Sequence, residues 1–188
     1  MKVLILSGNP RKNGNTMRIT NRFIDGVVKC GGEVEFIDTT SINVKPCTGC
    51  LFCENKEKCS IKDDMVYVYE KIIESDAVVL SSPVYFASVS AQLKTVIDRC
   101  QMLFSRRYVL KNTVDKKREG YMIFSAGGSN ERMIASMELL GKFFFLSCNG
   151  VLKESIFALG TDNMPVEEQA EVLTSAYLKG CEVVEHFR

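Results

Sequence analysis

Four of the eight cysteines of this chain lie within thirteen residues, in the stretch CTGCLFCENKEKC. These residues, Cys47, Cys50, Cys53 and Cys59, could ligate a metal, carry out redox chemistry or form disulfides. The apolar run before Ser7 is too short for a signal peptide, and no later run is long enough to cross a membrane, so we expect a cytoplasmic protein. In a reducing cytoplasm, clustered cysteines favour metal or redox chemistry over structural disulfides.

Length and charge restrict the class of protein. The 188 residues, 46% of them hydrophobic, predict a single domain spanning residues 1–188, with a Cys-rich loop at about 44–62. The 24 Lys and Arg against 23 Asp and Glu give a net charge of +1, which argues against a nucleic-acid partner.

Apolar runs alternate with helical patterns along the chain, and this alternation predicts an α/β fold with a parallel sheet covered on both faces. Strands are expected at residues 1–6, 33–37, 77–80, 121–124 and 151–157. Helices are expected at about 15–30, 64–75, 91–104, 131–146 and 166–186. Asp63 and Asp64 are placed to cap the second helix. The basic stretch 106–118 is expected to be a solvated loop.

A parallel sheet of this kind binds ligands at the carboxyl ends of its strands. The first such loop, SGNPRKNGNT, opens a helix, so backbone N–H groups, aided by Arg11, Asn15 and Thr16, could bind a phosphate. The loop is not a Walker loop, because Asn15 stands where that motif needs lysine. An ordinary polar turn is the alternative. Asp38, after the second strand, is a weak candidate for a ribose ligand.

Two further loops suit a flat ring. SSPVYF places Pro83 and Tyr85 beside the same crevice, although its aromatic residues could instead be core or dimer contacts. Ser125 to Gly128 form a small-residue loop that lets a ligand approach closely. Phosphate, ring and close-approach surfaces together fit a mononucleotide with a large planar head, namely FMN.

The segments SGNPRKNGNT and SSPVYFASVSAQLKTVIDR, with the cysteine stretch followed by Asp63-Asp64-Met65, together resemble the NADPH-dependent FMN reductase family, and within it the iron-sulfur flavoproteins. The resemblance extends to about Gly128. It implies a flavodoxin-like three-layer sandwich with strand order 2-1-3-4-5, and FMN bound by the first and second loops. The candidate cofactor-binding residues are Ser7, Asn9, Arg11, Asn13, Asn15, Thr16, Pro83, Val84, Tyr85, Phe86, Ser125, Gly127 and Gly128.

The cysteine spacing can now be interpreted further. Compact C-x2-C-x2-C runs recur in sites for [4Fe-4S] clusters, whereas structural zinc usually takes two separated pairs of ligands. The resemblance implies such a cluster on Cys47, Cys50, Cys53 and Cys59. Ser60 stands where the ferredoxin motif has proline, and zinc or free, redox-active thiols remain alternatives. The other cysteines, Cys30, Cys100, Cys148 and Cys181, are expected to be buried apolar residues.

The predicted function is therefore that of an FMN-dependent oxidoreductase or electron-transfer flavoprotein, whose cluster relays electrons between FMN and a small-molecule or protein redox partner. NAD(P)H is a possible electron donor. No catalytic side chain is expected, and His186 has no acid-base role. The alternatives are a cluster-free NAD(P)H-dependent FMN or quinone reductase and a zinc-stabilised binding module. The resemblance also implies a homodimer or homotetramer with Phe86 and the Cys-rich loop near the subunit interface.

Overall fold

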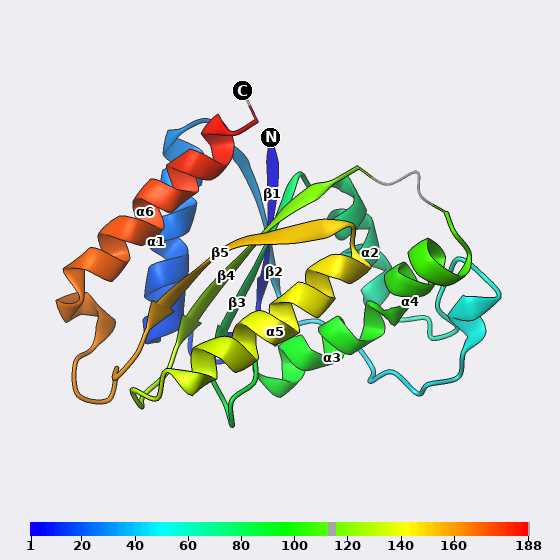
Figure 1. Cartoon of the computed structure of the whole chain (residues 1–188), viewed down its shortest axis with the longest axis horizontal. Helices are drawn as coiled ribbons and strands as arrows, with labels where there is room; N and C mark the ends of the chain where they lie inside the picture. Colours follow the sequence, from blue (N-terminus) through cyan, green and yellow to red (C-terminus); the bar gives the residue numbers. More distant parts are fainter. Residues whose placement is uncertain (113–115, 188) are drawn as a thin grey trace.

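The computed structural model describes residues 1–112 and 116–187, which form one parallel sheet between two layers of helices (Figure 1). Neighbouring strands are parallel, and their order across the sheet is β2-β1-β3-β4-β5. The strands are β1 (Lys2–Ser7), β2 (Glu33–Asp38), β3 (Ala77–Pro83), β4 (Arg118–Ser125) and β5 (Gly150–Ala158). The predicted fold class, strands and strand order are confirmed.

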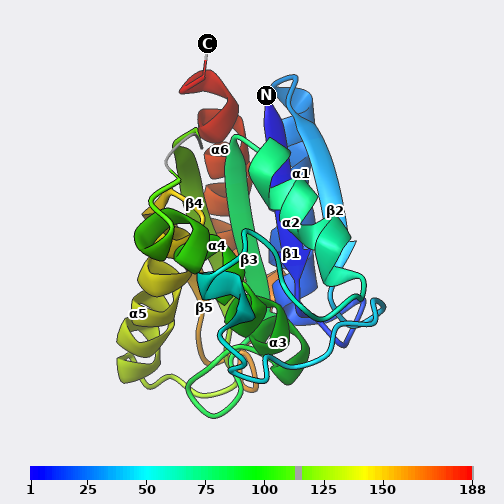
Figure 2. The same ribbon diagram turned by 90° about the vertical axis from the view of Figure 1, so that its right-hand side faces the viewer.

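Helices cover both faces of the sheet. The helices are α1 (Asn15–Lys29), α2 (Met65–Glu74), α3 (Ala91–Arg99), α4 (Gln101–Phe104), α5 (Arg132–Ser147) and α6 (Ala170–Glu185), with short helical turns η1 (Phe52–Glu54), η2 (Ser105–Val109) and η3 (Val166–Glu168). Helices α1 and α6 pack together on one face, while α2, α3, α4 and α5 lie on the other (Figures 1 and 2).

Alternation along the strands builds a separate core on each face. In β1, Val3 and Ile5 are buried in the core beneath α1 and α6, whereas Leu4 and Leu6 are buried in the core beneath α2, α3 and α5. Successive side chains of a strand point to opposite faces, so a strand covered on both sides reads as a continuous apolar run. The two cores hold the strand ends, and the loops that follow them, in fixed positions.

The two ends of the stretch 106–118 differ from the expected solvated loop. The helical backbone continues through Val109 in η2, and Arg118 begins β4 with its side chain buried. The Arg118 guanidinium donates hydrogen bonds to the carbonyls of Ile72, Ile73 and Cys148, at 2.6 to 2.8 Å. The prediction was wrong at Arg118 because these carbonyls, at the ends of α2 and α5, satisfy a buried charge. Residues 110–112, 116 and 117 lie outside helices and strands, as predicted. Residues 113–115 of the predicted loop lie outside the described residues.

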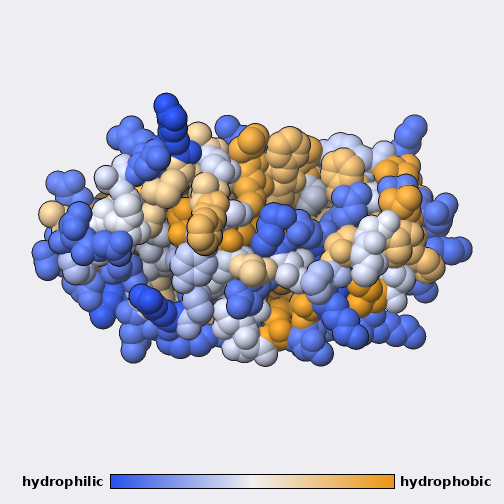
Figure 3. Space-filling model, turned by 90° about the horizontal axis from the view of Figure 1, so that it is seen from below, coloured by the Kyte–Doolittle hydropathy of each residue, from blue (hydrophilic) through white to orange (hydrophobic). Residues whose placement is uncertain are grey.

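The carboxyl ends of the strands and the start of α1 meet at one edge of the molecule, and the two chain termini lie at the opposite edge (Figure 1). Figure 3 looks onto the edge that carries the strand ends, where several apolar patches lie among hydrophilic residues. Within the described ranges, none of the helices has the length and apolar character that a bilayer crossing requires.

Candidate functional site

A cleft of about 600 Å³ opens at the carboxyl ends of β1, β3, β4 and β5. Its volume falls in the range typical of small-molecule sites. It lies where the chain order of the sheet reverses between β1 and β3, the usual ligand position in such folds. The cleft is lined by Asn9, Pro10, Arg11, Asn13, Gly14, Asn15, Thr16, Arg18, Pro83, Val84, Tyr85, Ser125, Gly127, Thr161, Asp162, Pro165 and Glu167.

A buried network of hydroxyl and amide groups fixes the start of α1 over the strand ends. The Asn9 amide donates to the hydroxyls of Ser7 and Ser81, at 3.0 and 2.7 Å. The Thr16 hydroxyl is hydrogen-bonded to that of Ser125 at 2.6 Å, which joins α1 to the end of β4. Because these buried polar groups satisfy one another, the loop between β1 and α1 is held in one conformation.

The start of α1 is suited to receive an anion. Gly14 occupies the N-cap position, no side chain caps the helix, and its first turn contains no acidic residue. The exposed N–H groups and the helix dipole therefore favour negative charge in the cleft. Arg11 and Arg18 add positive charge to the lining, although Arg18 also pairs with Glu167 at 2.9 Å.

The loop after β3 forms a tight turn beside the cleft. Tyr85 and Ser88 exchange backbone hydrogen bonds of 2.8 and 3.0 Å, and the two residues between them, Phe86 and Ala87, both have positive φ values, of 49° and 58°. Residues other than glycine rarely adopt this conformation, and such strain concentrates at functional loops. Tyr85 lines the cleft and is partly exposed, whereas Phe86 is fully exposed and does not line it.

The loops after β4 and β5 close the remaining side. The Gly127 carbonyl accepts the N–H of Asp162 at 3.4 Å, and a Cβ at Gly127 would lie only 2.2 Å from a carboxylate oxygen of Asp162. Gly127 therefore lets these two loops approach each other closely. Gly128 has open space around it and does not line the cleft.

Most of the predicted cofactor-binding residues come together in this cleft. Ten of them line it: Asn9, Arg11, Asn13, Asn15, Thr16, Pro83, Val84, Tyr85, Ser125 and Gly127. Ser7 instead lies beneath the loop as an acceptor for Asn9, and Phe86 and Gly128 lie outside the lining. Thr161, Asp162 and Pro165 also line the cleft but were not among the predicted residues. The sequence did indicate this position, because the three residues lie in the loop after the fifth predicted strand.

Asp38 does not line the cleft, in contrast to its suggested role as a ribose ligand. Its carboxylate accepts hydrogen bonds from Lys12, Thr40 and Ser41. Partial burial opposes ionisation of Asp38, but these hydrogen bonds outweigh it and lower its pKa from 3.8 to about 2. Asp38 therefore fastens the β1 loop to the end of β2.

The four clustered cysteines form a second candidate site. All four are free thiols that line one small hollow of about 40 Å³, at the segment shown in cyan beside α4 in Figure 1. Cys47 and Cys50 are exposed, whereas Cys53 and Cys59 are partly buried. A hydrogen bond to the Ser60 hydroxyl lowers the pKa of the Cys50 thiol. Among the described residues, no three His, Cys, Asp or Glu side chains are grouped closely enough to bind a single metal ion.

Arg99, at the end of α3, holds both ends of this cysteine segment. Its guanidinium donates to the Asp63 carboxylate at 2.7 and 3.0 Å, and to the carbonyls of Lys45 and Ile61 at 2.8 and 3.4 Å. Burial opposes the charge on Asp63, yet the hydrogen bond from Arg99 keeps its pKa below the ordinary value.

Asp64 stands at the N-cap position of α2, but its side chain accepts the N–H of Asn43 and does not cap the helix as predicted.

The other cysteines are only partly as predicted. Cys100 and Cys148 are buried, whereas Cys30 and Cys181 are partly exposed at the contact between α1 and α6.

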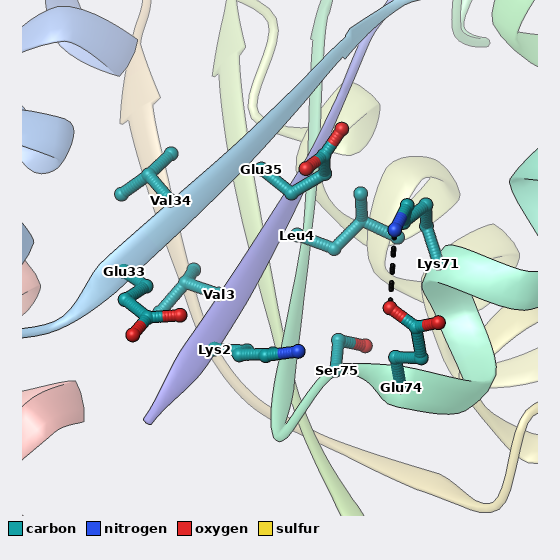
Figure 4. A pocket seen from close by; sticks show the side chains of 9 residues that line it. All are labelled: Lys2, Val3, Leu4, Glu33, Val34, Glu35, Lys71, Glu74 and Ser75. Atoms are coloured by element: carbon teal, nitrogen blue, oxygen red, sulfur yellow. Dashed lines mark hydrogen bonds and ion pairs between the residues drawn. The ribbon is translucent and has the colours of Figure 1, made fainter.

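A further hollow of about 150 Å³ lies at the amino ends of β1 and β2, where Lys71 pairs with Glu74 at 3.1 Å (Figure 4). It lies at the opposite end of the strands from the cleft.

Known proteins resemble this chain in sequence and fold. The family described as NADPH-dependent FMN reductase matches residues 1–163. An iron-sulfur flavoprotein of Archaeoglobus fulgidus is 34% identical over 188 residues, which cover 100% of this chain and 80% of that protein. An iron-sulfur flavoprotein of Methanocaldococcus jannaschii is 42% identical over 103 residues, or 55% of this chain and 53% of that protein. The alignment thus spans about half the length of the second relative.

Solved structures share the fold at low sequence identity. The NAD(P)H:quinone oxidoreductase of Methanothermobacter marburgensis superposes with a TM-score of 0.74 at 19% identity, over 97% of this chain and 96% of that one. A flavone reductase superposes with a TM-score of 0.70 at 17% identity, over 98% of this chain and 62% of that one. These likenesses establish the flavodoxin-like fold.

Proposed function

The chain belongs to the NADPH-dependent FMN reductase family, and on that basis we propose that it is an oxidoreductase with FMN bound in the cleft at the strand ends. The observation that carries this proposal is the start of α1, which combines unused N–H groups, Arg11 and an absence of acidic residues in the first turn of the helix. Asn13, Asn15 and Thr16 would hold the phosphate there.

The other loops suit the ring system of FMN. Pro83, Val84 and Tyr85 provide a flat, partly apolar wall on one side of the cleft. On the other side, Gly127 presents backbone without a side chain in the way. When bound, FMN would supply the hydride and electron chemistry, with NAD(P)H as the proposed donor. The chain would orient the ring, shield one of its faces from water and tune its potential through hydrogen bonds from loop amides.

For the cysteine segment we propose a [4Fe-4S] cluster on Cys47, Cys50, Cys53 and Cys59. The donor set fits, because each of the four irons of such a cluster takes one thiolate. The four thiols therefore need to surround a shared hollow, as they do here, and need not meet at one point as the ligands of a single metal ion would. The hollow of about 40 Å³ has to widen around a cluster. Cys47 and Cys50 lie outside helices and strands, so this widening would break neither.

The small volume of that hollow favours one alternative, a cluster-free reductase that uses NAD(P)H to reduce FMN or a quinone. In that case the thiols would stay free, and Cys→Ser changes would leave NAD(P)H turnover unaltered. The third candidate function is that of a zinc-stabilised binding module, which would contain zinc and no flavin. The four clustered cysteines are free thiols, which supports the proposed cytoplasmic location.

We also propose that the protein is a homodimer or homotetramer. Phe86 is fully exposed beside the cleft, and on α5 Phe143 and Leu139 are 66% and 57% exposed. Exposed aromatic and aliphatic side chains of this size favour a protein contact. The cysteine segment lies near the same helical layer. Gel filtration at micromolar concentration is expected to give a dimer or tetramer, and a monomer would contradict this part.

The functional proposal is tested on protein purified without oxygen. We expect one FMN per chain, bleaching of the flavin absorption on addition of NAD(P)H, and four iron atoms per chain. Flavin with neither iron nor zinc would support the cluster-free reductase. Zinc without flavin would support the binding module. Protein that contains no flavin and binds no added FMN would contradict the redox function altogether.

A further inference from the structure

One atom of Arg99 stands out from the rest of its side chain. Arg99 is 2% exposed, and its two terminal nitrogens have four oxygen acceptors between them. Its Nε is fully buried and has no hydrogen-bond partner. A buried N–H without an acceptor costs about 1 to 3 kcal/mol and is rare in folded proteins. Such an atom would gain an acceptor from a partner bound beside it.

The position of Arg99 indicates what that partner is. The residue lines the same hollow as Cys47, Cys50, Cys53 and Cys59. Its other nitrogens already bind the carbonyls of Lys45 and Ile61, which flank the four cysteines on either side. Sulfur atoms of a group held in this hollow would therefore be candidate acceptors for the remaining N–H.

We propose that Arg99 is a positioning residue of the cysteine site, which fixes both ends of the segment and donates its Nε–H to a sulfur atom of the group bound there. The inference rests on the proposed [4Fe-4S] cluster. Hydrogen bonds to cluster sulfurs favour the more negatively charged, reduced state. The bidentate pair with Asp63 keeps the guanidinium in the orientation that this bond needs.

Two Arg→Lys variants separate the hydrogen bond from the charge. Arg99→Lys keeps a positive charge for Asp63 but lacks Nε–H. Arg106→Lys is the matched control, because the Arg106 Nε is likewise buried without a hydrogen-bond partner and pairs with Glu57 of the cysteine segment only at 3.6 Å, but Arg106 does not line the hollow. Flavin content and thermal melting of each variant report whether its fold is intact.

The 188-residue chain is labelled with 15N at the guanidinium nitrogens of arginine, loaded with iron and sulfide without oxygen, and reduced with dithionite. Pulsed EPR of the wild type and of Arg106→Lys is expected to show a weak arginine 15N coupling to the cluster. In Arg99→Lys this coupling should be lost, and the midpoint potential of the cluster should shift to a more negative value than in both other proteins.

A wild-type cluster with four iron atoms and no arginine coupling would overturn the inference and leave the proposed cluster intact. A coupling that persists in Arg99→Lys, or an unchanged potential in that variant, would overturn it as well. If Arg99→Lys binds no iron, the wild type alone tests the inference. An arginine 15N coupling in the wild type then supports it, and a missing coupling overturns it. A wild-type chain that takes up no iron would overturn both the cluster and the inference.

Discussion

At the scale of single residues, Gly127 and Gly128 are neighbours in sequence with opposite surroundings. A Cβ on Gly127 would lie 2.2 to 2.5 Å from the Asp162 carboxylate, whereas a Cβ on Gly128 would meet no atom within 4 Å. Since real Cβ atoms do not approach other atoms so closely, an alanine at Gly127 must displace the Asp162 carboxylate, which belongs to the cleft lining. Gly128 can accept the same change.

We therefore expect Gly127→Ala to weaken FMN binding about tenfold, equivalent to about 1.4 kcal/mol, because it displaces one side of the cleft. Gly128→Ala serves as the control and should bind FMN as the wild type does. Fluorescence titration of the flavin-free proteins measures both affinities. Equal affinities for the two variants would show that the contact between these loops does not shape the flavin site.

A second prediction concerns Asp38 and pH. Its folded-state pKa of about 2 lies below the ordinary 3.8, so its carboxylate stabilises the fold above about pH 4, and this contribution is lost as the pH falls toward 2. Lys12 is 62% exposed, so solvent screening limits the contribution to about 1 kcal/mol. Urea unfolding should show Asp38→Asn to be less stable than the wild type at pH 6, with a smaller difference at pH 3. A difference independent of pH would contradict this role.

At the scale of elements, the start of α1 is the proposed phosphate site. Asn15 lines the cleft there, and its side-chain oxygen accepts the N–H of Val166 at 3.2 Å. Aspartate has nearly the same shape and keeps this acceptor but adds a negative charge. The charge would repel a phosphate without disturbing the connection between α1 and η3.

Asn15→Asp is accordingly expected to weaken binding of FMN about tenfold and to leave binding of riboflavin, which has no phosphate, unchanged. Asn21→Asp carries the same charge on an exposed position of α1 outside the cleft, and should bind both flavins normally. Equilibrium titration with each flavin gives the comparison. An equal loss for riboflavin and FMN would place the phosphate elsewhere.

Arg118 connects three elements through buried hydrogen bonds, from β4 to the carboxyl ends of α2 and α5. Arg118→Met removes the guanidinium donors from these carbonyls, of which Ile72 keeps the Ser75 hydroxyl as a donor, so we expect a loss of about 3 kcal/mol in the free energy of unfolding. The exposed Arg22, paired with Asp25, is the matched control, and Arg22→Met should cost at most about 1 kcal/mol. Denaturant unfolding at neutral pH measures both. A similar small loss for Arg118→Met would contradict its structural role.

The same elements show how far the sequence could be interpreted. Apolar runs, together with the alternation of apolar and charged residues at 33–37, identified all five strands, and the polar loops after strands one, three and four contain most of the cleft lining. Arg118 was misjudged because a basic run gives no sign that distant carbonyls will bury one of its members. The pairing of Arg99 with Asp63 joins residues 36 positions apart, so local patterns could not reveal it.

At the scale of the whole molecule, the sheet brings two kinds of site onto one small domain. The cleft depends on loops from four strands, and the cysteine hollow depends on a segment fastened to α3 by Arg99. In the proposed function the chemistry belongs to bound cofactors, and the protein is the scaffold that selects and orients them.

The central claim is that this cleft binds FMN with its phosphate at the start of α1. A crystal structure of the chain grown with FMN tests it most directly. We expect phosphate oxygens within hydrogen-bond distance of the backbone N–H groups of Asn15 and Thr16, with the ring beside Tyr85. FMN bound elsewhere, or a cleft that stays without FMN at saturating concentration, would contradict the claim.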